Sequence, residues 1–180
     1  IESGFCMLDF GSSRPASGAE HHASHYWEMQ LLLNNKRAIL HGAKVGFALM
    51  GVARQYAKIR EIDRSEMMDR LEAATLPDRD AEVAIINESY GPVAKTVIDT
   101  HGEFLDMSEE KFEEVKQRIA ANWDKIQEVA AKVPALEVIK GYLDRAGAPT
   151  DADALGLGES AVKPGFEYGH YLRNRFTVMK

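Results

Sequence analysis

Histidines gather in one stretch of the 180-residue chain. Of the six histidines, three fall within five positions and a fourth follows on a separate segment: His21, His22, His25 and His41. Good helix formers without Pro or Gly predict a helix over Glu20–Leu33, which would place His21 and His25 on one face, four residues apart. His22 would point about 100° away from them. His41 can converge on the shared face from outside this helix.

Two imidazoles facing one point, with a third near by, are typical of a divalent metal site. Neutral imidazole is the commonest protein ligand for ions such as zinc, nickel or iron. A catalytic metal usually has three protein ligands and one open position, and a carboxylate often joins two histidines. The alternative is that the pair on the predicted helix is merely solvated. The His-Gly pair at His41 favours the metal interpretation over this alternative.

The composition predicts one soluble domain over residues 1–180, located in the cytoplasm. A net charge of −6 argues against a nucleic-acid or anionic-membrane partner, because both need clustered Lys and Arg. The sequence also contains no apolar run near the ~20 residues that span a membrane. The single cysteine, Cys6, excludes an intrachain disulfide, and we expect it to be a small buried residue in a reducing compartment.

Apolar residues recur at helical spacing along most of the chain, so we expect an all-α, multi-helix bundle. The stretch before residue 16 is rich in turn formers and predicts an irregular approach. Further helices are predicted over 40–59, 63–74, 108–132, from Pro134 to Gly147, and over 166–176. The stripe of large apolar residues in 108–132 predicts a core face. Three glycines in 40–59, at Gly42, Gly46 and Gly51, indicate close approach of a neighbouring element.

Other patterns concern helix ends and absent motifs. Ser17 with Glu20 three residues later predicts a capping box, and the free amides at that helix start, with Arg14 near by, could hold an anion. A surface ion pair is the alternative for Arg14. His101 is expected on a loop or the surface. The sequence has no GxGxxG, P-loop or GxSxG motif, so it shows no nucleotide-phosphate cradle of its own.

Three segments carry a family resemblance: GSSRPASGAEHHASHYWEM, ILHGAKVG and YGHYLRNRFTV. Together they resemble the C-terminal helical domain of the glycerol-1-phosphate dehydrogenase family. This family shares a superfamily with glycerol dehydrogenase, iron-dependent alcohol dehydrogenases and dehydroquinate synthase. The resemblance implies that an N-terminal domain, absent from this chain, binds NAD(P), and that the metal lies between the two domains.

The resemblance also implies roles for single residues. His21 and His41 fall on the metal ligands, and His25 falls on a catalytic position in the second shell or in contact with substrate. The doubled histidine leaves a one-residue ambiguity at His22. The third family ligand is an aspartate from the segment preceding this domain, and Asp9 does not take its motif.

The implied reaction is the interconversion of dihydroxyacetone phosphate and sn-glycerol 1-phosphate with NADH or NADPH, assisted by zinc, nickel or iron as a Lewis acid. A phosphorylated three-carbon substrate needs basic partners, and the candidates are Arg14, Lys44, Arg173 and Arg175. Surface or salt-bridge roles are the alternative for each of them.

We expect the chain without its nucleotide-binding domain to be inactive, and a homodimer is compatible with the resemblance. Alternatives are a glycerol dehydrogenase-like or dehydroquinate synthase-like enzyme, and a noncatalytic helical interaction module.

Overall fold

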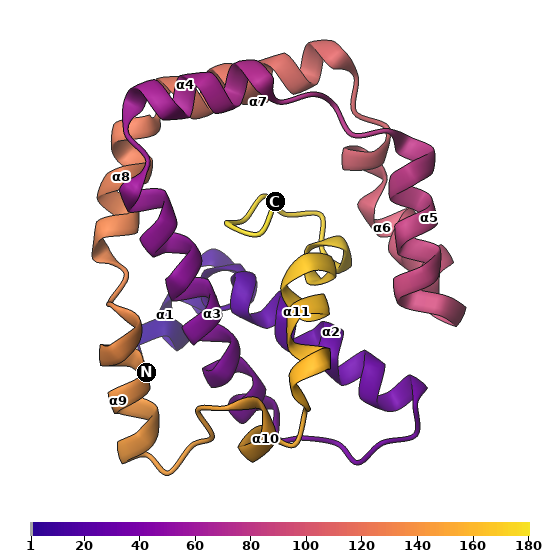
Figure 1. Ribbon diagram of the computed structural model, residues 1–180, viewed down its shortest axis with the longest axis vertical. Helices are drawn as coiled ribbons and strands as arrows, with labels where there is room; N and C mark the ends of the chain where they lie inside the picture. The colour runs from indigo at the N-terminus through magenta and orange to yellow at the C-terminus, as the bar shows by residue number, and fades with distance from the viewer. Residues whose placement is uncertain (1) are drawn as a thin grey trace.

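The computed structural model describes residues 2–180, and the regular elements among these residues are all helical (Figure 1). The prediction of an all-α, multi-helix fold is confirmed. The α-helices are α1 (Glu2–Phe10), α2 (Ala19–Leu33), α3 (His41–Glu61), α4 (Arg64–Ala73), α5 (Arg79–Tyr90), α6 (Ala94–Leu105), α7 (Glu109–Ala121), α8 (Trp123–Lys132), α9 (Leu136–Arg145), α10 (Ala152–Leu155) and α11 (Glu159–Tyr168). Three short 3-10 turns, η1 (Arg14–Ala16), η2 (Gly91–Val93) and η3 (Gly169–Leu172), join them.

The helix α2 is the centre of the packing. It contacts α3, α11 and η3, while α8 and α9 pack along α3 (Figure 1). Buried aromatic side chains fill the contact, with Trp27 packed edge-on against Phe166 of α11 and Tyr26 edge-on against Tyr90 of α5. Such large rings supply most of the apolar area that a helical core removes from water. The α2–α3 pair is therefore held rigidly on several sides.

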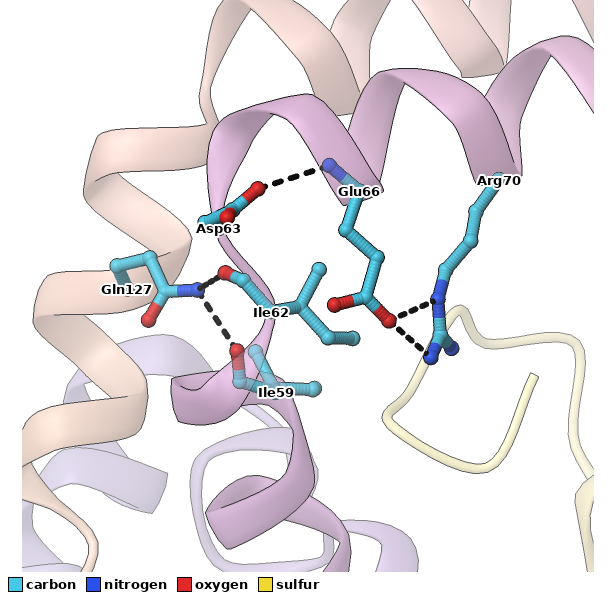
Figure 2. A network of polar contacts seen from close by, with 6 residues as sticks. All are labelled: Ile59, Ile62, Asp63, Glu66, Arg70 and Gln127. Carbon is cyan, nitrogen blue, oxygen red and sulfur yellow. Dashed lines mark hydrogen bonds and ion pairs between the residues drawn. The ribbon is translucent and has the colours of Figure 1, made fainter.

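Polar contacts fix the helix ends. Asp63 accepts a hydrogen bond from the amide of Glu66 and caps α4, as its sequence position predicts. Figure 2 shows this cap beside the side chain of Gln127, which donates to Ile59 O at 2.7 Å and to Ile62 O at 3.0 Å. These two carbonyls lie at the end of α3, where the usual donors four residues further on are missing, although Ile59 O also accepts the amide of Ile62 at 3.2 Å. Gln127 thus joins α8 to the turn between α3 and α4.

The helix predicted over 108–132 is wrong in one respect, because it is two helices. Ser108 caps α7 as expected, but the chain breaks at Asn122, whose side chain bonds back to Arg118 O, and α8 begins at Trp123. None of the residues of α7 is buried, so the expected core face is also wrong there. The helix α7 packs mainly on α4, with which it runs side by side (Figure 1), and a single narrow partner covers little of its apolar stripe.

Both ends of the chain also differ from expectation. The segment before residue 16 contains the helix α1, and Cys6 on it is exposed rather than buried. The last α-helix runs over Glu159–Tyr168 instead of 166–176, and it contains Pro164. Pro164 has no amide to donate to the carbonyl four residues before it, and α11 is held against α2 by Trp27, whose Nε1 donates to Ala161 O at 2.9 Å.

Two of the three glycines in α3 lie at close contacts, as predicted. A Cβ atom at Gly51 would lie 2.1 Å from Cζ of Phe166, and one at Gly46 would lie 2.9 Å from Cδ2 of Leu143. Gly42 has no neighbour of this kind within 4 Å. Among residues 2–180, no helix combines the length and the apolar character needed to cross a membrane.

Candidate metal centre

Three imidazoles meet where α2 passes the start of α3. His21 and His25 lie on α2, and His41 is the first residue of α3. The ring centroids are 6.1 Å apart for His21 and His25, 5.4 Å for His21 and His41, and 5.2 Å for His25 and His41. The structure therefore brings together the three histidines that the sequence placed on one face and on a separate segment.

Glu28 is a fourth member of this group that the sequence reasoning missed. Its Oε2 atom lies 3.6 Å from Nδ1 of His25 and 3.9 Å from Nδ1 of His41. One ligand atom from each of His25, Glu28 and His41 falls within 4.8 Å of the others. The available signal was spacing, because a residue three after His25 shares its face of the helix.

His21 is held by a carboxylate of its own. Oε1 of Glu20 lies 2.7 Å from Nδ1 of His21 and also accepts the amide of Gly18 at 2.9 Å. A carboxylate can only accept here, so Nδ1 donates to it and Nε2 is the ring nitrogen left to bind a metal. Carboxylate–histidine pairs of this kind orient metal-ligating imidazoles and raise their basicity.

The predicted helix start is only partly right. The N-cap residue is Gly18 rather than Ser17, and no side chain caps it from that position. The other half of the capping box is present, since the Glu20 side chain reaches back to the Gly18 amide. The segment before α2 is therefore fixed by the same carboxylate that orients His21.

Lys44 lies behind the site rather than in it. Its side chain is fully buried, Nζ donates to Ile39 O at 2.6 Å, and the Glu28 carboxylate is 3.9 Å away. A buried ammonium needs such partners because desolvation is costly. Lys44 thus ties the turn before His41 to α3. Its buried side chain is not placed to contact a substrate phosphate, the role considered for it from the sequence.

His22 and His25 have different surroundings. Burial lowers the pKa of His25, with smaller contributions from the charges of His41 and Arg173. A neutral imidazole is the form that binds metals. His22 points away from the cluster into the protein, where burial and then Arg175 and Arg173 lower its pKa to about 4. Both of its ring nitrogens are buried without a hydrogen-bond partner.

His101 lies in a second cluster, and the expectation of a loop or surface position is wrong. It is buried on α6, stacks on Phe104 and lies 3.4 Å from Nζ of Lys180. His170 lies beside it, with ring centroids 5.9 Å apart. A cavity of about 330 Å³ adjoins this cluster and is lined mainly by apolar side chains.

The donor set at the first cluster fits a divalent transition metal. Ligand atoms about 2.0–2.3 Å from one ion lie within about 4.6 Å of one another, close to the 4.8 Å found for His25, Glu28 and His41. Imidazoles with one carboxylate suit zinc, nickel and iron. The fold and this cluster together define the class of the protein as an all-helical polypeptide with a candidate metal centre between two crossing helices.

Sequence comparison identifies the relatives. The chain is 31% identical to glycerol-1-phosphate dehydrogenase [NAD(P)+] of Geobacillus thermodenitrificans, over 99% of the chain and 35% of the relative. It is 32% identical to the enzyme of the same name from Bacillus licheniformis, over 100% of the chain and 32% of the relative. A stretch of 56 residues is 59% identical to that of Halalkalibacterium halodurans, covering 31% of the chain and 14% of the relative.

The chain is similar to glycerol-1-phosphate dehydrogenases along its whole length, and it spans about a third of the length of the relatives that it matches. No protein-family model matches the sequence, and neither does any solved structure.

Proposed function

We propose that this chain is the helical, metal-binding part of an enzyme that interconverts dihydroxyacetone phosphate and sn-glycerol 1-phosphate with NAD(P). One observation carries the proposal: in a chain that aligns along its whole length with enzymes of that name, three imidazoles from two helices converge. The Glu20 carboxylate beside His21 adds support, because metal-ligating imidazoles are usually oriented by such a partner.

His21 and His41 would hold the metal, through Nε2 in the case of His21. The ligand atoms that lie within 4.8 Å of one another belong to His25, Glu28 and His41, so this assignment of His21 follows the family resemblance rather than that grouping. Glu28 lies 3.9 Å from His41 and is a carboxylate that this chain can offer. A bound divalent metal would polarise the substrate oxygen and stabilise the charge of an alkoxide while hydride moves between substrate and nicotinamide.

His25 would contact the substrate. Its lowered pKa keeps the ring neutral near pH 7, so that one nitrogen can donate and the other can accept a hydrogen bond. In this proposal NAD(P) is bound mainly by the part of the polypeptide outside the 180 residues, since no nucleotide-binding motif occurs in the chain.

Metal titration of the purified chain, freed of metal by chelation, tests the site. We expect Zn²⁺ or Co²⁺ to bind with one ion per chain, and His21→Ala or His41→Ala to abolish that binding. His25→Ala should bind the metal but, in the full-length enzyme, lower kcat by roughly 100-fold, within the range for a positioned acid–base group. If the His21 and His41 variants bind as well as the unsubstituted chain, the histidines are a surface cluster and the proposal fails.

Substrate choice is tested in the full-length enzyme. Oxidation of NADH or NADPH should be much faster with dihydroxyacetone phosphate than with dihydroxyacetone. Equal rates with the two compounds would instead identify an enzyme of the glycerol dehydrogenase type.

A further inference from the structure

Two cavities outside the imidazole cluster adjoin each other. The inner one, of about 330 Å³, has the buried His101 in its wall and lies between α5, α6, α7 and residues 176–180. The outer one, of about 720 Å³, continues between α6, α7 and the start of α8. The two share four lining side chains, Phe104, Met107, Val115 and Phe176. They therefore form one α6–α7 groove, and ligand pockets commonly measure roughly 300–1,000 Å³ with mainly apolar walls.

The α6–α7 groove is elongated because it follows the apolar stripe of α7. Phe112 lines the inner cavity, Val115 lines both cavities, and Ile119 lines the outer one. These three side chains span two turns of helix, or about 10 Å, and Ile126 of α8 extends the wall further. None of the residues of α7 is buried, so the described part of the chain leaves this stripe uncovered. A long, narrow apolar ligand fits such a groove.

Most polar side chains in the wall of the groove already have internal partners. Four contacts engage them: Tyr171 with Glu82, Asn174 with Glu103, Arg79 with Asp106 and Lys111 with Glu114. A wall whose polar groups are satisfied in this way offers few hydrogen bonds to a polar ligand, whereas its apolar surface gains from removal from water. The wall therefore favours a mainly apolar ligand.

The charges of the groove favour an anionic group on that ligand. The wall carries four cationic and two carboxylate side chains, although the chain as a whole has a net charge of −6. Nζ of Lys180 lies 3.4 Å from Nδ1 of His101 and 3.1 Å from the centroid of the Phe104 ring, and no carboxylate side chain among residues 2–180 pairs with it. Burial lowers the pKa of Lys180 to about 7, because a desolvated ammonium without a counter-charge is costly.

We propose that the α6–α7 groove binds a fatty acid, with its carboxylate paired to Lys180 and its acyl chain lying along the stripe of α7 past Val115. The carboxylate supplies the counter-charge that the ammonium lacks, and the methylene groups remove the apolar wall from water. This inference does not rest on the proposed function, because His21, His25 and His41 do not line the groove.

Fatty acids of increasing length test the groove. Calorimetric titration of the full-length protein, below the micelle concentration of each ligand, should show one molecule bound per chain. Two further buried methylene groups should tighten binding roughly 15-fold, so dodecanoate should bind more tightly than decanoate, and decanoate more tightly than octanoate, by about that factor. An affinity that does not rise with chain length, or no binding of dodecanoate, would overturn the inference.

Val115→Trp tests the path of the acyl chain. A larger side chain where the two cavities meet should weaken dodecanoate binding by roughly tenfold or more, and Val115 is only half-buried, so the melting temperature should change little. Val129→Trp is the matched control, because Val129 is an exposed valine on α8 that does not line the groove. Equal losses in the two variants, or none in the Val115 variant, would contradict the inference.

Lys180→Met tests the charge. Methionine keeps an apolar stem but removes the ammonium, so dodecanoate should bind roughly tenfold or more weakly while uncharged dodecanol binds as before. Lys95→Met removes an exposed ammonium from α6 outside the groove and should change neither affinity. The same loss in both variants would show a general effect of charge, and the assignment of Lys180 would be wrong.

Two further titrations exclude other occupants and other sites. Binding of dodecanoate by the 180-residue chain but not by the full-length protein would show that the remaining polypeptide covers the groove, and the inference would fail. His41→Ala should bind dodecanoate like the unsubstituted protein. Loss of binding in this variant would place the carboxylate at the metal centre instead, which would overturn the inference and leave the proposed function intact.

Discussion

At the residue scale, the Glu20 carboxylate has two hydrogen-bonding roles. Its Oε1 atom accepts from the Gly18 amide and from Nδ1 of His21, so it fixes the start of α2 and the ring of a proposed metal ligand together. Glu20→Gln keeps an oxygen for the amide but removes the charge on which the imidazole relies. We expect a fall in Zn²⁺ affinity of roughly 10-fold, at the lower end of second-shell effects, measured by competition with a chromophoric chelator.

Glu72→Gln is the control for this prediction. Glu72 is an exposed glutamate on α4, away from the imidazole cluster. It removes the same charge from the chain, so a comparable loss of Zn²⁺ affinity in both variants would show a general electrostatic effect rather than a role for Glu20.

The pair formed by the buried His101 of α6 and the half-buried His170 of η3 predicts that stability depends on pH. Burial, followed by nearby positive charge from Lys180, lowers the pKa of His101 to about 3 and that of His170 to about 4. Unfolded histidine titrates near pH 6.5, so below that value the unfolded chain binds more protons than the folded one. The free energy of unfolding should therefore fall as pH is lowered from 6.5 toward 4, by about 1–2 kcal/mol per histidine at pH 5.

Urea unfolding at pH 7 and pH 5 measures this effect. The titratable groups that face the pair are Lys180, Tyr171 and His22, and Lys180, with a pKa lowered to about 7, is already mostly protonated below pH 6.5. His101→Gln cannot titrate, so it should reduce the difference between the two pH values. A difference as large as in the unsubstituted chain would show that His101 is not responsible.

Single residues were predictable from sequence where spacing alone decides their direction. His21 and His25 share a face, and His22 points away, because helix geometry requires it. The burial of Lys44 and His101 was not predictable, since it depends on how neighbouring elements cover them. The spacing of Glu28 from His25 predicts that both lie on one face of the helix. Its place in the cluster depends on the position of His41, which only the structure gives.

At the scale of elements, the glycines of α3 allow a direct test. Gly51 faces the ring of Phe166 across the contact with α11, and a Cβ atom there would overlap it. Gly51→Ala should lower the free energy of unfolding by about 1–3 kcal/mol through overpacking, which thermal or urea unfolding would measure. Gly42→Ala, in the same helix but with open space around its Cα, should raise it by up to about 1 kcal/mol. Equal effects of the two changes would contradict the close approach of α11 to α3.

Helices were predicted well where a cap and an apolar face agree, as at Asp63. They were predicted poorly where tertiary contacts decide the ends. The apolar stripe in the sequence continues across Asn122, but the helix breaks there. The reason is that α7 packs on α4, whereas α8 packs on α3. Likewise Pro164 lies inside α11, a helix that packs on Trp27 of α2.

At the scale of the whole molecule, the chain supplies one part of the proposed reaction. It spans about a third of the length of the relatives it matches, and it contains the imidazole cluster but no nucleotide-binding motif. We therefore expect the purified 180-residue chain to bind Zn²⁺ yet to leave NADH and NADPH unoxidised when mixed with dihydroxyacetone phosphate and excess metal. The full-length enzyme, assayed by the loss of NADH absorbance, should turn over under the same conditions, and its His41→Ala variant should not. Turnover by the chain alone near the rate of the full-length enzyme would show that these helices also bind the dinucleotide. The proposal that NAD(P) is bound mainly outside these 180 residues would then be wrong.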